Sequence, residues 1–464
     1  MVGAGDDGDP AVLDGDVQAA ARRAIVGTDR AHRAYYAFVT SVVERLHRLH
    51  PFQSRDAQRL ALLFAIVYFS QGMYYVSSQP VTFTLKERLG LSAAQVGTFG
   101  WITLLPWVVK PVYGILSDSV PIFGRRRKSY FLITCTLATL AGLTLAMQAT
   151  ANYWSLALLI MLMGLGIAFN DVLTDAMMVE NGKPLGLTGA FQAMQWGAIN
   201  AATILVGLIG GYFAEHGNLR GAFLVASAFP LLAGVMGAIF IHEPPAKARG
   251  EELREAWVGI RTAVGDRTMW IVAGFLFFWT FSPSIGIPLY YFQTDTLKFT
   301  QQFIGLLGSL GAGASIIGAM FYAPISRRLS LHRTITMSIA LGVIGTLVYL
   351  LYDGPVAAVL IDTAFGGVSM IIQLAFLELA AKACPKHAEG TFFALLMSVY
   401  NLGTQGSQVT GGFLYDRIGY TPLVLISAAM TGAAYFLLPL VNVPEIERQA
   451  AQSGPPPEID PAVA

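Results

Sequence analysis

The sequence predicts an all-α membrane protein whose twelve transmembrane helices form two related six-helix halves. Three observations lead to this fold class. Of the 464 residues, 54% are hydrophobic and only 13% are charged, whereas about 25% of the residues of a soluble domain are charged. Twelve apolar runs are long enough to cross a bilayer, and the second six resemble the first six at a nearly fixed spacing. The net charge of +1 gives no indication of a nucleic-acid partner.

The chain before the first apolar run is expected to form a cytoplasmic tail over residues 1–59. Its first sixteen residues are acidic and rich in glycine, the reverse of a signal peptide. From Arg22 to about Arg59, arginine and histidine are mixed with apolar residues. This pattern fits an amphipathic helix at the membrane interface, and the composition fits a poorly ordered tail with a short terminal helix equally well.

The apolar runs define the helices and the domains. A bilayer core about 30 Å thick needs about 20 apolar residues per helix. This length predicts transmembrane helices near residues 60–83, 95–116, 129–149, 153–178, 188–214, 219–241, 269–292, 302–325, 332–352, 355–379, 391–414 and 420–441. The two predicted bundles are therefore 60–241 and 269–441, joined by a charged cytoplasmic linker at 242–268. Residues 442–464 are predicted to be a tail, because the Gly-Pro-Pro-Pro run at 454–457 ends any helix.

The basic residues of the loops set the orientation. Loops on the side of the N-terminus hold twenty Lys and Arg residues, counting only the last twenty residues before the first span, and loops on the other side hold five. Cytoplasmic loops are enriched in Lys and Arg. We therefore expect both termini in the cytoplasm of a multi-pass protein of the cell (inner) membrane.

An internal repeat relates the two halves. A shift of 208 residues places Pro80 on Pro288, Gly97 on Gly305 and Gly100 on Gly308. A shift of 201 residues places Asn200 on Asn401 and Gly210-Gly211 on Gly411-Gly412. Parallel six-helix repeats hold the substrate path between them, near the middle of the bilayer.

The loop after the second span has the composition of a conformational latch. Asp118 ends a helix, Gly124 supplies a turn, and Arg125 and Arg126 precede the next helix. A carboxylate there can pair with an arginine in one conformation and release it in the other. The enrichment of cytoplasmic loops in basic residues would explain the arginines, but it would not explain Asp118 and the glycines of this loop. We expect smaller effects from Arg127 and Lys128, whose charges lipid headgroups can satisfy.

Three stretches carry a family resemblance. The loop just described resembles the signature loop of the major facilitator superfamily, with a longer spacer. Within that superfamily, residues 106–124, 170–180 and 389–398 are similar to the folate–biopterin transporter branch. The resemblance implies a major facilitator fold and uptake of folates or reduced pterins together with protons. We expect a monomer without cofactor or metal.

Few ionisable groups lie within the predicted spans, where each is costly unless it is paired or solvated. Lys110 is the only basic one and could meet the carboxylates of a folate. Asp171 and Asp175 are four residues apart, so they share one helix face, and we expect them to couple protons to transport. Glu378 lies near the cytoplasmic end of the tenth span.

Amide side chains are further candidates for the site. Gln192, Gln195 and Asn200 lie on the fifth predicted span, and Asn401 and Gln405 lie on the eleventh. Such amides can hydrogen-bond to a heteroaromatic ring, but they can equally join helices to each other, at about 0.6–2 kcal/mol each.

Two other functions stay open at this stage. One is a facilitator for another organic solute, including the efflux of drug-like compounds. The other is a receptor or scaffold without transport. The sequence has no Gly-rich phosphate-binding motif and no room for a nucleotide domain, which argues against an enzyme or an ATP-driven pump.

Overall fold

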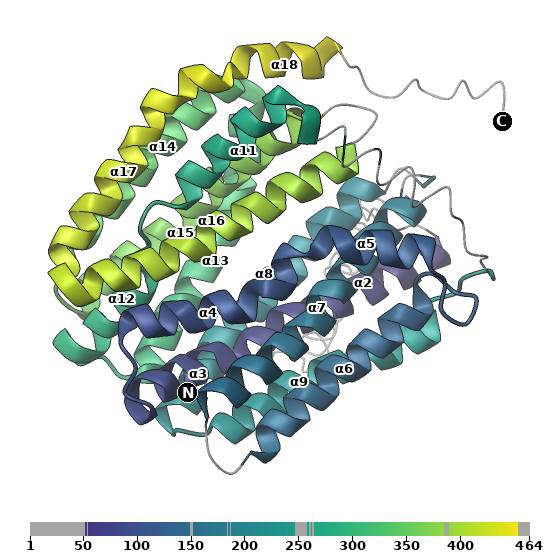
Figure 1. Ribbon diagram of the computed structural model, residues 1–464, viewed down its shortest axis with the longest axis horizontal. Helices are drawn as coiled ribbons and strands as arrows, with labels where there is room; N and C mark the ends of the chain where they lie inside the picture. The colour runs from purple at the N-terminus through teal and green to yellow at the C-terminus, as the bar shows by residue number, and fades with distance from the viewer. Residues whose placement is uncertain are drawn as a thin grey trace, which may run out of the picture. The chain divides into compact units, whose positions relative to one another are not determined.

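The structure is a computed structural model, shown in Figure 1. It describes residues 52, 54–148, 152–182, 184, 185, 187–245, 258, 261, 264–384 and 389–452. The chain divides into two units, Met1–Arg59 and Leu60–Ala464. The predicted amphipathic helix of the N-terminal tail lies outside the described residues. All that follows concerns the second unit, apart from the first residues of helix α2.

The first half of the chain forms six consecutive spanning segments. The first segment combines α2 (Arg55–Met73), a 3₁₀ turn (Tyr74–Ser77), α3 (Ser78–Phe83) and a π-helical turn (Thr84–Arg88), and the second combines α4 (Ala93–Val108) with α5 (Lys110–Ser119). Four single helices follow: α6 (Lys128–Met147), α7 (Tyr153–Gly182), α8 (Thr188–Glu215) and α9 (Leu219–Phe240). All six predicted spans of this half coincide with these segments.

The second half repeats this order. Helix α11 (Arg267–Thr280), α12 (Gly286–Tyr291) and a π-helical turn (Phe292–Thr296) come first. Then come α13 (Gln301–Arg328), α14 (Leu331–Val348), a 3₁₀ turn (Tyr349–Leu351), α15 (Pro355–Lys382), α16 (Glu389–Ile418), α17 (Tyr420–Val441) and α18 (Val443–Gln452).

Ten helices among the described residues are long and apolar enough to cross a membrane. The two predicted spans outside this set are 269–292 and 391–414. The first is interrupted between Thr280 and Gly286, and the second lies within α16, a 30-residue helix that carries several polar side chains. The fold is therefore all-helical as predicted, while the count of twelve membrane crossings stays a prediction.

The repeat seen in the sequence is present in the helix boundaries. Helix α3 and its π-helical turn recur as α12 and its own π-helical turn, 208 residues later at every boundary. Helix α4 begins at Ala93 and α13 at Gln301, again 208 residues apart. Helices α9 and α17 begin and end 201 residues apart. The two halves thus share their local backbone geometry, including an uncommon one-turn π-helix.

Paired glycines join the halves to each other. Helix α8 packs against α13, and α16 packs against α4. A Cβ atom on Gly211 would lie 2.9 Å from the carbonyl oxygen of Gln301 in α13, and one on Gly412 would lie 2.5 Å from that of Ala93 in α4. Any larger residue would push the helices apart.

The first glycine of each pair, Gly210 or Gly411, packs against a different kind of partner. Pro80 and Pro288 have no N–H to donate to the carbonyl four residues earlier. Gly210 lies against the first of these carbonyls, that of Val76, and Gly411 lies against the second, that of Ser284. These contacts stay within one half. The fixed spacing of the glycine pairs therefore reflects close backbone approach at two positions in each half.

The predicted tail at 442–464 begins with a helix instead. Val443 and Ile446 of α18 are buried in the same apolar cluster as Leu331 and Ile335 of α14. This burial stabilises a short helix that would be marginal alone. The Gly-Pro-Pro-Pro run on which the prediction was based follows this helix and lies outside the described residues.

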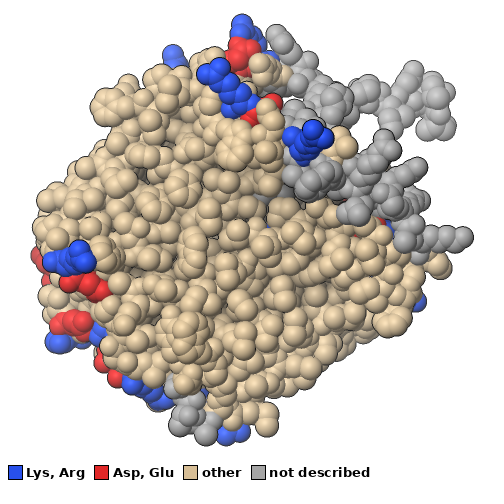
Figure 2. Space-filling model, viewed as in Figure 1, with Lys and Arg blue, Asp and Glu red and all other residues tan. Residues whose placement is uncertain are grey.

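Charged side chains gather at the margins of the molecular face in Figure 2, and a broad uncharged area lies between them. This distribution suits a surface in contact with lipid. We call the end of the helices that holds Arg125–Lys128 the basic end, and the end where α8 finishes and α13 begins the far end.

Candidate functional site

A cavity of about 250 Å³ lies between the two halves. Most of its wall belongs to the first and second spans of the N-terminal half, and α7 adds Ile160. The C-terminal half contributes Ile287 of α12 and Gln405 of α16. The remaining residues of the wall are Tyr74, Tyr75, Ser77, Ser78, Val81, Thr82, Leu85, Val96, Phe99, Gly100, Thr103, Leu104 and Trp107.

The break in the first helix brings polar groups to this wall. The 3₁₀ turn at Tyr74–Ser77 separates α2 from α3, and Pro80 follows it. Tightening of the helix at this point places both Tyr74 and Tyr75, and then Ser77 and Ser78, on the cavity. A regular helix would turn neighbouring residues to different faces. The local sequence thus gives the cavity a polar and aromatic side.

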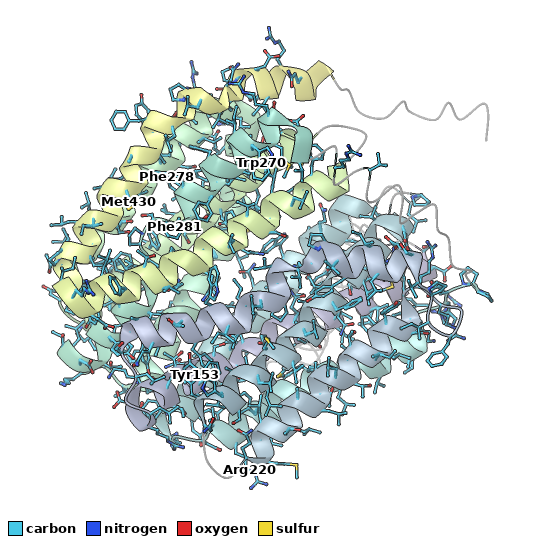
Figure 3. The ribbon with its side chains drawn as sticks, viewed as in Figure 1. Tyr153, Arg220, Trp270, Phe278, Phe281 and Met430 are labelled. Carbon is cyan, nitrogen blue, oxygen red and sulfur yellow. The ribbon has the colours of Figure 1, made fainter. Side chains whose placement is uncertain are left out.

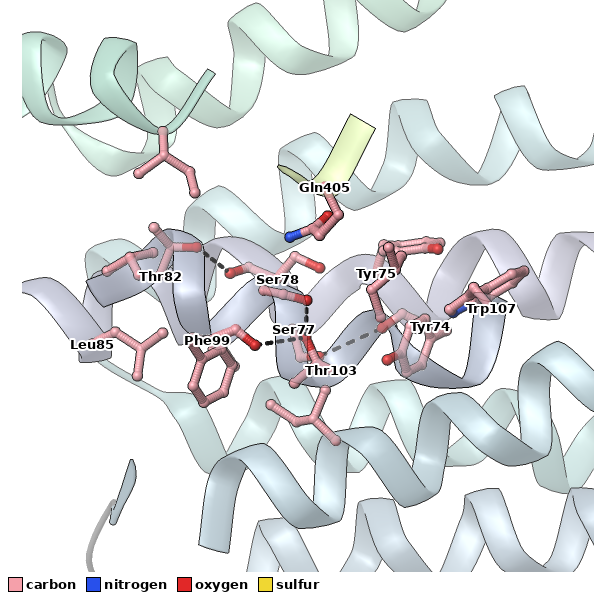
Figure 4. Close-up of a pocket in the computed structure, with 16 residues that line it drawn as sticks. Tyr74, Tyr75, Ser77, Ser78, Thr82, Leu85, Phe99, Thr103, Trp107 and Gln405 are labelled. Atoms are coloured by element: carbon pink, nitrogen blue, oxygen red, sulfur yellow. Dashed lines mark hydrogen bonds between the residues drawn. The ribbon is translucent and has the colours of Figure 1, made fainter. Parts of the chain in front are cut away.

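Gln405 faces this side from the other half. In Figure 4 its amide points from α16 toward Ser78 and Tyr75. Gly100 of α4 lies directly against the same amide, so a larger residue there would displace it. An amide can donate and accept hydrogen bonds at once, and tyrosine and tryptophan rings can stack on a flat ligand. This arrangement suits a planar ring with polar edges.

An ion pair lies beside the cavity. The Nζ atom of Lys110 is 2.5 Å from Oδ2 of Asp171 and 4.6 Å from the centre of the Trp107 ring. The Lys110 side chain is 26% exposed and that of Asp171 only 5%. Lys110 begins α5 at the interruption of the second span, which Pro111 causes by lacking an N–H. Trp107 therefore connects the cavity wall to a partly accessible cation.

Asp175 lies one turn after Asp171 on α7, and its partners differ from those of Asp171. The hydroxyl of Tyr68 in α2 donates to its Oδ1 atom, and Nε2 of Gln195 in α8 lies 3.3 Å from the same atom. Both partners are neutral. The two acids predicted as a pair thus lie on one helix as expected, but Asp171 faces a cation and Asp175 faces hydrogen-bond donors without charge.

The structure separates the other predicted amides. Gln195 contacts Asp175 and Gln405 lines the cavity, whereas Asn200 donates to the Trp196 carbonyl of its own helix, 2.8 Å away. Gln192 is exposed, and Asn401 is partly buried one turn before Gln405. Of the five amides, Gln405 is the one on the cavity wall.

Glu378 lies outside the cavity wall, within the C-terminal half. Its Oε2 atom accepts a hydrogen bond from the Tyr322 hydroxyl, and its Oε1 atom is 2.6 Å from Nζ of Lys382 on the next turn of α15. Its charge is therefore paired near the end of the helix.

The predicted latch includes Arg127, an arginine for which the sequence predicted only a small effect. Asp118 lies 2.6 Å from the guanidinium of Arg127, which also contacts Glu180 at 2.7 Å and Ser117 at 2.9 Å. The Arg127 side chain is 8% exposed. Its burial lowers the pKa, but the hydrogen bond to Glu180 and the charges of both carboxylates outweigh this effect and raise the pKa. Arg127 therefore stays charged.

The turn before Arg127 determines where the arginines of this loop lie. Ile122 and Arg125 exchange backbone hydrogen bonds of 3.0 and 3.1 Å around Phe123 and Gly124. Both central residues have positive φ angles, 51° and 68°, as a type I′ turn requires. The Arg125 side chain is exposed on this turn. The turn predicted at Gly124 thus agrees with its conformation, and Arg127 joins the predicted arginines as a partner of Asp118, on which the charge of Arg126 also acts.

Glu243 fixes the position of Arg127. Its carboxylate, just after α9, accepts hydrogen bonds from the backbone N–H groups of Arg126, Arg127 and Lys128 at 2.8–3.1 Å. These groups start α6 and have no partner within the helix. Glu243 was not among the residues that the sequence predicted for the site. Tyr68 and Tyr322 were not predicted either, because nothing in the sequence marks these two of the eighteen tyrosines as carboxylate partners.

Comparison with known proteins identifies relatives over most of the chain. The model of the BT1 family matches residues 71–431. The Folate-biopterin transporter of Synechocystis sp. is 32% identical over 370 residues, which cover 76% of this chain and 74% of that protein. The Probable folate-biopterin transporter 4 of Arabidopsis thaliana is 25% identical over 455 residues, with coverage of 81% and 92%.

Solved structures are similar in fold. The nucleoside transporter NupG matches with a TM-score of 0.64 at 14% identity, covering 82% of this chain and 98% of that one. The D-xylose-proton symporter matches with a TM-score of 0.65 at 13% identity, with coverage of 82% and 96%. At this level of identity the likeness concerns the fold, which is that of major facilitator transporters.

Proposed function

Because the chain belongs to the BT1 family, we propose that it is a secondary transporter, rather than an enzyme, for folates or pterin-like solutes. Several relatives are named as folate or folate-biopterin transporters. The observation that carries the proposal is the cavity between the two halves, with tyrosine and tryptophan on one side and the Gln405 amide on the other. Alternating access exposes such a cavity first at one end and then at the other.

The cavity wall fits the chemistry of a pterin ring. The ring is flat, so it can stack on Tyr75 or Trp107. Its amino-pyrimidinone edge presents donors and an acceptor, which the amide of Gln405 and the hydroxyl groups of the opposite wall can match. These contacts orient the ring across both halves. Substrate would therefore hold the halves together during the conformational change.

We assign the glutamate tail of a folate to Lys110. The cation is partly accessible and lies against Trp107, which also lines the cavity. A substrate carboxylate can replace Asp171 as the partner of Lys110, since both are charge-assisted acceptors. Asp171 thereby keeps Lys110 paired when no substrate is bound, which avoids an isolated charge inside the membrane.

We assign proton coupling to Asp175 rather than to both acids. Asp171 has a cation at 2.5 Å, whereas the contacts of Asp175 come from Tyr68 and Gln195, which carry no charge. Taking up a proton at Asp175 therefore leaves no unpaired cation behind. Release of that proton at the other side of the membrane would return the transporter to its starting state.

We place the basic end in the cytoplasm of the cell (inner) membrane and expect a monomer. Helix α9 ends at the basic end and α17 does so as well, which agrees with the loop charges. Reporter fusions after Pro244 and after Val441 should both report the cytoplasm, and one at Asp295 should report the opposite side. Opposite reports from the first two fusions would reject this topology.

Ligand binding tests the substrate class. Purified protein should be stabilised against heating by folates and pterins, and less by unrelated organic anions. Trp107→Ala and Gln405→Ala should remove this stabilisation, whereas the control Asn200→Ala should keep it because its side chain bonds to its own helix. Equal stabilisation by unrelated drug-like compounds would favour the transport of another organic solute.

Uptake into proteoliposomes tests transport and its coupling. Proteoliposomes with the wild-type protein should accumulate a folate that binds in the preceding test when a pH gradient is imposed. The Asp175→Asn variant should lose the response to the gradient but should still exchange folate across the membrane. Binding without any uptake would favour a receptor. Uptake that ignores the gradient would reject proton coupling without affecting the substrate assignment.

A further inference from the structure

Two carboxylates at the far end cross from one half to the other. Oε2 of Glu215, the last residue of α8, accepts hydrogen bonds from the backbone N–H groups of Gln301 and Gln302 at 2.5 and 3.3 Å. The two oxygens of Asp416, near the end of α16, accept from Ala93 and Ala94 at 3.2 and 3.0 Å. Each carboxylate therefore covers the beginning of a helix in the opposite half.

The two contacts repeat each other at the spacings of the internal repeat. Glu215 and Asp416 are 201 residues apart, and the helix starts that they cover, Ala93 and Gln301, are 208 residues apart. In both helices the N-cap side chain, Ser92 or Thr300, accepts from the third N–H group only. The first two N–H groups are left for the carboxylate of the other half.

The position of these acids within their own helices is unfavourable. A negative charge at the C-terminal end of a helix is repelled by the helix dipole. The same charge is stabilised at the N-terminal end of a helix, which is where the opposite half places it. The negative charge of each acid is thus stabilised by contact between the halves, and not by the acid's own helix.

We propose that Glu215 and Asp416 are a pair of gate residues that hold the far end closed during transport. We call them the reciprocal caps. The proposal rests on the proposed alternating access. Both side chains are exposed, so when the halves separate, water can hydrate the carboxylates and the N–H groups. Opening therefore breaks the contacts without leaving a charge buried, which makes the gate reversible.

Neighbouring contacts agree with a closed far end. Lys86 of the first half lies 2.5 Å from Asp295 of the second, and the Tyr291 hydroxyl donates to the Leu91 carbonyl at 2.5 Å. Gly211 and Gly412, one turn before the reciprocal caps, make the closest backbone contacts with the same two helix starts. The caps therefore lie one turn beyond a close approach of the two halves.

Spin-label distances at both ends test the gate without any substrate, so the result does not depend on the folate assignment. One label pair, at Arg220→Cys and Asp353→Cys, spans the two halves at the far end, and Arg220 lies in the first turn of α9, at the lower edge of Figure 3. The second pair, at His242→Cys and Arg333→Cys, spans them at the basic end. All four positions are exposed. Cys384→Ala removes the native thiol that labels could reach, since Cys135 is buried.

Glu215→Ala and Asp416→Ala should each raise the population with a wide far end by roughly threefold to tenfold, as expected for losing a helix cap. The double variant should multiply the two effects, because the sites are separate. The basic end should narrow at the same time. Glu87→Ala is the matched control, since its carboxylate lies at the same end but contacts Lys86 of its own half.

Two results would overturn the proposal. Unchanged far-end distances in the double variant would mean that the caps do not hold the gate. Widening at both ends would mean that they only stabilise the fold. Glu215→Gln and Asp416→Asn should give smaller shifts than the alanine variants, because an amide oxygen still accepts hydrogen bonds without the charge.

Discussion

The N-terminal half pairs Lys110 of α5 with Asp171 of α7, whereas the ion pair between Glu378 and Lys382 of the C-terminal half lies on one turn of a single helix. The other carboxylate contacts within the C-terminal half come from tyrosine hydroxyl groups, Tyr322 to Glu378 and Tyr349 and Tyr352 to Asp362. The loops differ in the same way. Asp118 and Arg127 form an ion pair after the second span, whereas the corresponding residues of the C-terminal half, 325–328 at the end of α13, include no acid. Among the described residues, the ion pairs that join separate elements of one half are therefore those of the N-terminal half.

The backbone features are shared instead. Both halves have a proline-broken first helix, a one-turn π-helix, a glycine pair and a cap from the opposite half, at the spacings of the repeat. Movement of two halves against each other needs matching contacts on both sides. The two halves therefore share the backbone contacts by which they pack together, while their ion pairs differ.

The largest expected effect concerns the first glycine of the pair in each half, Gly210 and Gly411. A Cβ atom on Gly411 would collide with the Ser284 carbonyl, whereas one on Gly210 would lie 3.0 Å from the Val76 carbonyl. Gly411→Ala should lower the stability by about 3 kcal/mol or more, and Gly210→Ala by less. Thermal melting of the purified variants measures this difference. Gly308→Ala is the control, since nothing lies within 4 Å of its Cβ position, and equal melting of Gly308→Ala and Gly411→Ala would contradict the packing argument.

Arg127→Ala should reduce transport at least about tenfold, because hydrogen bonds to charged groups contribute about 1.5–3 kcal/mol each and two carboxylates lose their cation. Arg328→Ala, at the end of α13 in the other half, should change transport little because its side chain is exposed. Uptake normalised to folded protein makes the comparison. Similar losses in both variants would reduce the latch to a general basic charge.

Tyr68→Phe and Tyr322→Phe each remove one hydroxyl from a carboxylate. The first should weaken the response of uptake to a pH gradient about fivefold, since one side-chain hydrogen bond contributes about 1 kcal/mol net. The second should have little effect, because Glu378 keeps Lys382 as its partner. Initial uptake rates at several imposed gradients test this. A larger effect of Tyr322→Phe would move the coupling site to the C-terminal half.

The smallest effect is expected at two helix starts of the basic end. Glu243 accepts from three backbone N–H groups at the start of α6, and Glu447 accepts from Leu331 at the start of α14. Glu243→Gln should cost about 1 kcal/mol of stability and Glu447→Gln less. The melting midpoints should follow that order. The reverse order would show that α18, which carries Glu447, contributes more than its single bond indicates.

Much of the fold could be predicted because its causes are local in sequence. Apolar runs of bilayer length predicted the helices, and the spacing of Pro80, Pro288 and the glycine pairs predicted the repeat that the helix boundaries confirm. Gly124 was recognisable because a turn with positive φ favours glycine. The helix α18 was missed, because a short amphipathic helix is stabilised by an apolar cluster made from distant parts of the chain.

The candidate site depended on the tertiary structure. The sequence by itself determined that Lys110, Asp171 and Asp175 lie on membrane helices, and that the last two share a face. It could not determine that Asp171 meets Lys110 while Asp175 meets Tyr68, or that Arg127 is the partner of Asp118. Periodicity along one helix fixes which residues share a face, but the packing of separate helices decides what that face meets.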